Sequence, residues 1–323
     1  MPLLDQLLSN DYGLIVTGLV LLALGAEVLV HGAVSLALRL RVSPLLIGVT
    51  IVAWGTSTPE LLVSVNASMN GNYGIAVGNV VGSNIFNILL IIGLVSVISP
   101  ISVPARAIGR DGLFALAAAG LFAWIAMRMN VMGLAEGVLL LATLLAMAVF
   151  TYGQERDAAD RPGRELPTPP EHSVLIDLLL IGTGLGLLII GADMLVHGSV
   201  SIARDFGVSE TIIGLSLVAI GTSVPELATS IVAAFRGKAD IALGNATGSN
   251  IYNILGILGV AALLGPVRID PEIVQVDMWV MIAATLALFP PLLLGGRIGR
   301  LYGLLLLAGC AAYAFFLFSK MGQ

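Results

Sequence analysis

Ten long apolar stretches follow one another along the chain, and this succession limits its possible folds more than any other feature. About 20 mostly apolar residues are needed for a helix to cross a membrane. Inside a bilayer every backbone N–H and C=O needs a protein partner, so stretches of this length predict membrane-spanning helices. Only 11% of the residues are charged and 58% are hydrophobic, which excludes an ordinary water-soluble domain. The expected spans are residues 12–38, 44–69, 73–98, 107–127, 132–152, 175–203, 209–235, 239–264, 274–295 and 298–318.

The second half of the chain repeats the first. Three segments recur at one constant offset of 166 positions, which indicates a duplication and not a chance likeness of apolar composition. The matching segments are ALGAEVLVHGAVSLA at 23–37 with IIGADMLVHGSVSIA at 189–203, GTSTPE at 55–60 with GTSVPE at 221–226, and GNVVGSNIFNIL at 78–89 with GNATGSNIYNIL at 244–255.

A polar stretch rich in proline and charge separates the two copies. We therefore expect a first five-helix repeat at 1–152, a linker at 153–174 and a second repeat at 175–323. Five is an odd number, so the second copy has to enter the membrane from the opposite face. The sequence thus predicts an all-α fold of two inverted five-helix repeats, a design that places a substrate site at the repeat interface.

The distribution of lysine and arginine predicts the orientation. With the N-terminus outside, the inner loops receive eleven of the fifteen Lys and Arg residues and the outer side receives four. By the positive-inside rule, both termini then face out and the linker is cytoplasmic. We expect an inner (plasma) membrane protein in contact with lipid.

Glu60 and Glu226 fall in the middle of the second and seventh spans, where a charge costs about 2.5–3.5 kcal/mol on insertion scales. Such a cost calls for a cation. Each glutamate follows a proline, Pro59 or Pro225, which removes a backbone donor and is expected to break the helix about one turn upstream. The breaks are expected near Ala53 and Gly55, and near Ala219 and Gly221.

Neutral oxygen donors surround these glutamates in the sequence. Ser83 and Asn87 are four residues apart and share one helix face, as do Ser249 and Asn253. Two carboxylates, hydroxyls, amides and freed carbonyls suit calcium or sodium, whereas magnesium demands a stricter octahedron. Zinc and copper prefer sulfur or imidazole, and the single cysteine, Cys310, lies in another span. One divalent ion would balance the two carboxylates.

The paired GTSxPE and GNxxGSNxxNI segments, five spans to each half, resemble the alpha repeats of the calcium/cation antiporter superfamily, specifically the prokaryotic sodium/calcium exchangers. The resemblance covers nearly the whole chain. It implies exchange of calcium for sodium by alternating access, in which the first and sixth helices slide across the bundle. The implied calcium site uses Glu60, Glu226, Thr56 and Thr222. The implied sodium sites use Ser57, Ser83, Ser223, Ser249, the Ala53 and Ala219 carbonyls, and a middle position between Asn87 and Asn253.

The chain also departs from some members of this superfamily. Potassium-dependent members place an aspartate where this chain has Asn253, so potassium dependence is not expected. The linker of about 20 residues is too short for a regulatory calcium-binding domain.

Two further acid and histidine pairs lie outside these motifs. Glu27 and His31, and likewise Asp193 and His197, are four residues apart on one helix face. Each pair is open to interpretation as a proton relay or as a structural pair. A proton-coupled calcium exchanger is therefore the alternative function, and replacing a sodium gradient by a pH gradient would separate the two.

Other classes of function have less support. A cation channel could use the same oxygens but would not need an inverted duplication. An intramembrane hydrolase would need a nucleophile near the acids, so no enzyme activity is expected. No basic patch or phosphate-binding glycine motif predicts a nucleic-acid or nucleotide partner, and no cofactor is expected beyond the transported ions. The sequence does not define the oligomeric state.

Overall fold

A computed structural model describes residues 10–40, 42–102, 105–159, 173–206, 219–293 and 296–321. The described chain is almost entirely helical, as expected where the backbone has no water to bind. In the first half the elements are α2 (Asp11–Leu40), α3 (Pro44–Ile47), η1 (Gly48–Val52), α4 (Ala53–Thr56), α5 (Thr58–Met69), α6 (Tyr73–Phe86), η2 (Asn87–Ile92), α7 (Gly93–Ile98), β1 (Ile101–Ser102), α8 (Ala105–Arg128), β2 (Val131–Met132) and α9 (Leu134–Ala159), where η marks a π-helical turn.

The described elements of the second half follow a similar order. Its elements are α10 (Val174–Asp205), α12 (Ala219–Thr222), α13 (Val224–Phe235), α14 (Ala239–Ile251), η4 (Tyr252–Ile257), α15 (Leu258–Leu264), β3 (Val267–Arg268), η5 (Ile273–Asp277), α16 (Met278–Leu286), α17 (Pro290–Leu293), β4 (Arg297–Ile298) and α18 (Arg300–Met321).

Seven of the described helices are long and apolar enough to cross a membrane, and the bent pair of Pro44–Thr56 with Thr58–Met69 adds an eighth. The expected seventh span, 209–235, is described only from Ala219 onward. The expected ninth span is shorter than predicted, because its helix ends at Leu286 and resumes at Pro290. Pro290 and Pro291 have no backbone N–H and cannot continue the preceding helix.

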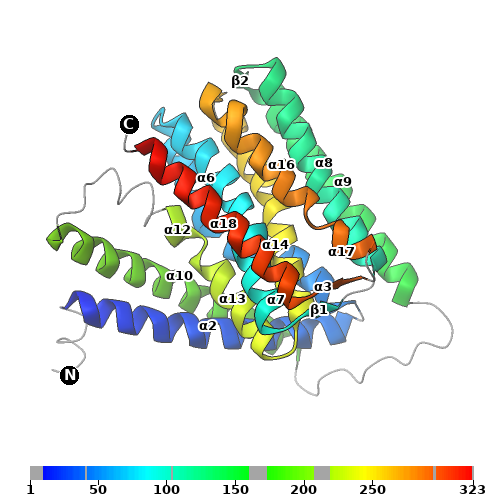
Figure 1. Ribbon diagram of the computed structural model, residues 1–323. Helices are drawn as coiled ribbons and strands as arrows, with labels where there is room; N and C mark the ends of the chain where they lie inside the picture. The colour runs from blue at the N-terminus through cyan, green and yellow to red at the C-terminus, as the bar shows by residue number, and fades with distance from the viewer. Residues whose placement is uncertain are drawn as a thin grey trace.

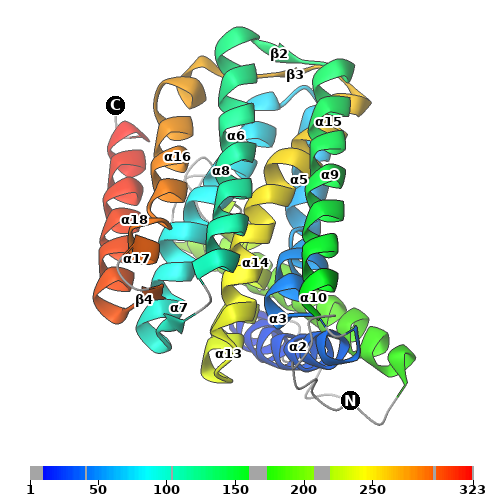
Figure 2. The same ribbon diagram turned by 90° about the vertical axis from the view of Figure 1, so that its right-hand side faces the viewer.

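Helices α2 and α10 lie side by side and cross the remaining helices on one side of the molecule (Figures 1 and 2). Glycines allow their backbones to approach closely: a Cβ at Gly25 would lie 2.9 Å from the Gly184 carbonyl oxygen, and one at Gly18 would lie 2.7 Å from that of Gly191. Since residue numbers rise along α2 as they fall along α10, the two helices are antiparallel. They occupy equivalent positions in the two repeats.

Both ends of this helix pair are closed by buried or half-buried polar contacts. Asp177, which is fully buried, accepts hydrogen bonds from Ser35 Oγ and from Arg39 Nε, the latter at 2.7 Å. At the other end, Ser201 Oγ donates to Asp11 Oδ2 at 2.7 Å. Asp11 and Ser35 are the first-repeat counterparts of Asp177 and Ser201, so the two contacts are related by the duplication.

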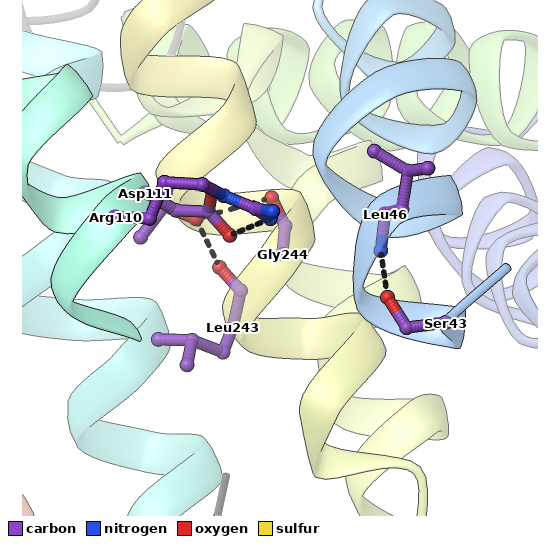
Figure 3. A network of polar contacts seen from close by, with 7 residues as sticks. Ser43, Leu46, Arg110, Asp111, Leu243 and Gly244 are labelled. Carbon is purple, nitrogen blue, oxygen red and sulfur yellow. Dashed lines mark hydrogen bonds and ion pairs between the residues drawn. The ribbon is translucent and has the colours of Figure 1, made fainter. Parts of the chain in front are cut away.

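Helix α14 lies at the centre of the molecule, with every residue buried except Asp240 (Figure 2). It packs on η1 and α3, on α13, and on α8. On the α8 side, the partly buried Arg110 Nε donates to Asp111 Oδ1 at 2.7 Å, and both residues face Leu243 and Gly244 of α14 (Figure 3). On the other side, Ser43 Oγ accepts a hydrogen bond from Leu46 N–H and caps α3 (Figure 3).

Two short antiparallel strand pairs join the repeats at the helix ends. Strand β1 pairs with β4, with Ile101 opposite Ile298, and β2 pairs with β3, with Met132 opposite Val267. Each pair contains one strand from each repeat. The two pairs are related to each other by the duplication, because β3 is the second-repeat counterpart of β1 and β4 is that of β2.

Candidate functional site

Glu60 and Glu226 lie in the first turns of α5 and α13, and both side chains are buried. Each glutamate accepts a hydrogen bond from a serine of the other repeat. Ser223 Oγ lies 2.9 Å from Glu60 Oε1, and Ser57 Oγ lies 3.0 Å from Glu226 Oε1. The helix N-terminus favours a carboxylate at this position. Each half of the site therefore combines a glutamate from one repeat with a serine from the other.

The helix break that forms each half lies at the serine. Ser57 and Ser223 leave helical geometry, with ψ of 8° and 6°, and the first break bends its span by 46°. The break was expected about one turn upstream of the proline, near Ala53 and Gly55, and that placement is wrong. Proline is well tolerated in the first turn of a helix, so a new helix begins at Thr58 with Pro59 in its first turn, and the discontinuity falls at Ser57. One turn further upstream, the chain forms the π-helical turn η1.

Several predicted oxygen donors meet at these breaks. Ser223 Oγ lies 3.1 Å from Ser83 Oγ on α6, and Thr56 Oγ1 and Thr222 Oγ1 each contact an asparagine of the other repeat. The Ala53 carbonyl accepts the Ser57 N–H at 3.0 Å and also lies 3.4 Å from Thr56 Oγ1. Ala219 is the first residue of α12.

Four asparagines join α6 and η2 to α14 and η4. Asn84 Nδ2 donates to the Asn250 carbonyl at 3.1 Å, and Asn250 Nδ2 donates to the Asn84 carbonyl at 3.0 Å. Asn87 Nδ2 then donates to Asn250 Oδ1, and Asn253 Nδ2 donates to Asn84 Oδ1. Asn84 and Asn250 are thus used in packing the two repeats together, while the amide oxygens of Asn87 and Asn253 are not used in this network.

Six buried side-chain oxygen atoms lack a hydrogen-bond partner within the described part of the chain, and five of them belong to predicted site residues. An unsatisfied buried polar atom costs about 1–3 kcal/mol, so a group of them indicates a ligand. All of them are oxygens, and an oxygen-only set suits a hard cation. These atoms are Glu60 Oε2, Glu226 Oε2, Asn87 Oδ1, Asn253 Oδ1, Ser249 Oγ and Thr229 Oγ1.

The two acid and histidine pairs lie elsewhere and differ from each other. His197 Nδ1 contacts the Asp193 side chain at 3.3 Å, and this pair is exposed. Glu27 is bound by Arg236 at the end of α13, with Nε to Oε2 at 2.9 Å, and His31 is exposed. Neither acid lies in the glutamate site, and their role as relay or structural pairs remains a prediction.

Sequence reasoning missed the asparagines that support the glutamates. Asn79 contacts the Glu60 carbonyl and Ser64, and Asn245 contacts the Glu226 carbonyl and Ser230. Asn79 and Asn245 belong to the repeated motif and lie four residues before Ser83 and Ser249. That spacing places them on the same helix face and was the available signal.

Membrane-spanning helices that enclose a two-glutamate oxygen cluster define an integral membrane protein for cation transport. The sequence model of the family described as sodium/calcium exchanger protein matches residues 11–153 and 176–319. This chain belongs to that family.

Similar proteins cover nearly the whole chain. The putative antiporter CaxA of Alkalimonas amylolytica is 42% identical over 95% of this chain and 98% of its own length. The sodium/calcium exchanger MaX1 of Methanosarcina acetivorans is 32% identical over 97% of this chain and 99% of its own. Structures of the sodium-calcium exchanger NCX_Mj soaked with Na⁺ and Ca²⁺ or Sr²⁺ share 34% identity, with a TM-score of 0.79 over 94% of this chain and 97% of theirs. These findings confirm the predicted superfamily and the transport of ions by antiport.

Proposed function

We propose that this protein exchanges calcium for sodium across the inner membrane by alternating access. The single observation that carries the proposal is the pair of buried glutamates, each bound by a serine of the other repeat and each with one carboxylate oxygen that has no hydrogen-bond partner among the described residues. Two ionised carboxylates balance one Ca²⁺, and this counter-charge offsets the cost of removing them from water.

In this proposal, calcium lies between Glu60 and Glu226, with Thr56 and Thr222 as further ligands. Calcium binds about 6–8 oxygens in flexible geometry, and two bidentate carboxylates with two threonine oxygens reach the lower number. The cationic partners are sodium and calcium, and no cofactor takes part. The proposed sodium positions use Ser57, Ser223, Ser83, Ser249, the Ala53 and Ala219 carbonyls, and the space between Asn87 and Asn253.

Shared oxygens would make the exchange obligatory. Ser57 and Ser223, proposed for sodium, contact Glu226 and Glu60, proposed for calcium, so the glutamate oxygens would serve either ion and occupancy by one ion would exclude the other. The antiparallel course of α2 and α10 supports two inverted repeats. In this proposal each repeat has five spans, ten in all, and the positive-inside rule places both termini outside and the linker in the cytoplasm. Sodium entering down its gradient would then drive calcium out of the cytoplasm.

The test is calcium uptake into proteoliposomes loaded with sodium. Wild-type protein should take up ⁴⁵Ca²⁺ when an outward sodium gradient is imposed and should not when a pH gradient replaces it. Glu60→Gln and Glu226→Gln keep the side-chain shape but remove a charge from the site, so each should abolish uptake. Transport by both variants would exclude the glutamate site, and uptake driven by pH alone would favour a proton-coupled exchanger.

A further inference from the structure

The side-chain amides of Asn79 and Asn245 each join three segments of the chain. Asn79, on α6, donates from Nδ2 to the Glu60 carbonyl at 3.4 Å and to Ser64 Oγ at 3.0 Å, both on α5. Its Oδ1 accepts from Thr222 Oγ1 of α12 at 3.3 Å. The amide therefore ties the helix that carries one glutamate to the broken helix of the other repeat.

Asn245 repeats this arrangement from α14. Its Nδ2 donates to the Glu226 carbonyl at 3.3 Å and to Ser230 Oγ at 3.1 Å, and its Oδ1 lies 3.1 Å from Thr56 Oγ1. Asn245 is fully buried, where water cannot replace these bonds. The same set of bonds formed twice, at equivalent positions, indicates that the geometry belongs to the site and not to local packing.

The asparagine contacts also bear on how the threonines face the site. A threonine hydroxyl has one proton and two acceptor lone pairs. The Thr222 hydroxyl donates to Asn79 Oδ1, and the Thr56 hydroxyl lies 3.1 Å from both Asn245 Oδ1 and the Val52 carbonyl, so each asparagine oxygen helps to orient a threonine hydroxyl. The amide N–H groups meanwhile hold the first turn of the glutamate helix, so one side chain sets the position of a carboxylate and of a threonine from opposite repeats.

We infer that Asn79 and Asn245 are positioning residues for calcium, each acting through the threonine that it contacts. This inference rests on the proposed function, because the threonines are its calcium ligands. It adds a pairing rule: Asn79 acts with Thr222, and Asn245 acts with Thr56. Loss of an asparagine should therefore raise the calcium concentration for half-maximal uptake more than it lowers the maximal rate.

Double-mutant cycles test the pairing rule. Asn79→Ala is combined with Thr222→Val, which removes the hydroxyl that Asn79 contacts, and separately with Thr56→Val, which removes the hydroxyl that Asn245 contacts. Asn245→Ala is combined with each of the same two threonine variants. Calcium affinity is measured by isothermal titration in detergent and as half-maximal uptake in proteoliposomes. Asn66→Ala, an exposed asparagine on α5, is the matched control. Should an alanine variant not fold as judged by gel filtration, serine at the same position completes the cycle.

Each asparagine variant should weaken calcium binding by about tenfold, with Asn66→Ala unchanged. Adding the variant of the threonine that the asparagine contacts should weaken calcium binding little further. Adding the variant of the other threonine should weaken it by a further factor, so that the two losses of affinity multiply. Equal multiplication in both pairings, or wild-type affinity in the asparagine variants, would overturn the inference. The wild-type uptake assay reports separately on sodium exchange, because calcium binding in detergent requires no sodium gradient.

Discussion

At the residue scale, the site is defined by oxygen atoms left without partners by the fold. Ser249 is fully buried on α14, and its hydroxyl has no hydrogen-bond partner among the residues described. Ser96, equally buried on α7, donates to the Ile92 carbonyl of its own helix at 2.7 Å. The two serines are equally buried, but only the Ser96 hydroxyl has a hydrogen-bond partner among the residues described.

This contrast gives a prediction for Ser249→Ala. The variant loses no hydrogen bond within the described residues, so its midpoint of thermal unfolding in detergent should equal or exceed that of the wild type. If the hydroxyl is a sodium ligand, the sodium concentration that gives half-maximal exchange should rise several-fold. Ser96→Ala is the control and should leave sodium dependence unchanged. An unaltered sodium dependence in Ser249→Ala would remove this serine from the sodium site.

At the scale of elements, two glycines let α14 pack closely against α3 and η1. A Cβ at Gly248 would lie 2.3 Å from the Val49 carbonyl oxygen, and one at Gly244 would lie 2.5 Å from that of Leu45. Both of these nearest atoms belong to the backbone, which cannot move away as the end of a flexible side chain can. The close contact brings Asn245 within reach of Thr56 on the segment that follows η1.

Gly248→Ala should therefore lower the midpoint of thermal unfolding, because an added methyl group in a tight contact costs about 1–3 kcal/mol. The matched control is Gly120→Ala on α8, where no described atom lies within 4 Å of the new Cβ. Alanine is the better helix former, so this control should be neutral or slightly stabilising. Equal unfolding midpoints for the two variants would show that the backbone of η1 shifts to accommodate the added methyl group without loss of stability.

At the scale of the whole molecule, the two repeats are held together by paired contacts at the ends of α2 and α10. Asp177 is fully buried between Ser35 and Arg39, and Arg39 is 22% exposed. Asp11 makes the equivalent contact with Ser201 at the other end of the pair. One end of the helix pair therefore contains an ion pair beside the serine contact common to both ends.

Asp177→Ala should lower the thermal midpoint of the wild-type protein markedly, since removal of one partner of a buried ion pair costs up to about 3–5 kcal/mol. Asp11→Ala removes the equivalent carboxylate from a half-buried contact and should have a smaller effect. Differential scanning fluorimetry in the same detergent compares the two. If the two variants have the same thermal midpoint, or if Asp11→Ala has the lower one, Arg39 is solvated or bound by another partner when Asp177 is absent.

The movement of net charge is also a property of the whole molecule. If three sodium ions exchange for one calcium ion, one positive charge crosses in each cycle, worth about 2.3 kcal/mol per 100 mV. An inside-negative potassium diffusion potential set with valinomycin should then slow calcium uptake into sodium-loaded proteoliposomes, because the three sodium ions that leave carry out more charge than calcium brings in. The rate with no imposed potential is the control. A rate of calcium uptake that does not depend on the potential would indicate electroneutral exchange.

Local sequence was enough to predict much of the fold. The bounds of the spans at 73–98 and 239–264 agree with the structure to the residue, because an apolar length is a property of adjacent residues. Pro59 predicted a break in the second span, and the structure places that break at Ser57. The ninth span was predicted too long, although Pro290 and Pro291 were visible in the sequence, since prolines within membrane helices are often tolerated.

The sequence by itself determined that this protein is a helical membrane protein with a duplicated chain, and its two buried glutamates predicted a cation site. These properties follow from apolar length, from a constant offset and from the cost of a buried charge, and none requires knowledge of distant contacts. Only the tertiary structure decided which side chain meets which: Arg236 with Glu27, Asn79 with Thr222, Ser57 with Glu226. Those partners lie more than a hundred residues apart, and helix packing brings their atoms within hydrogen-bond distance.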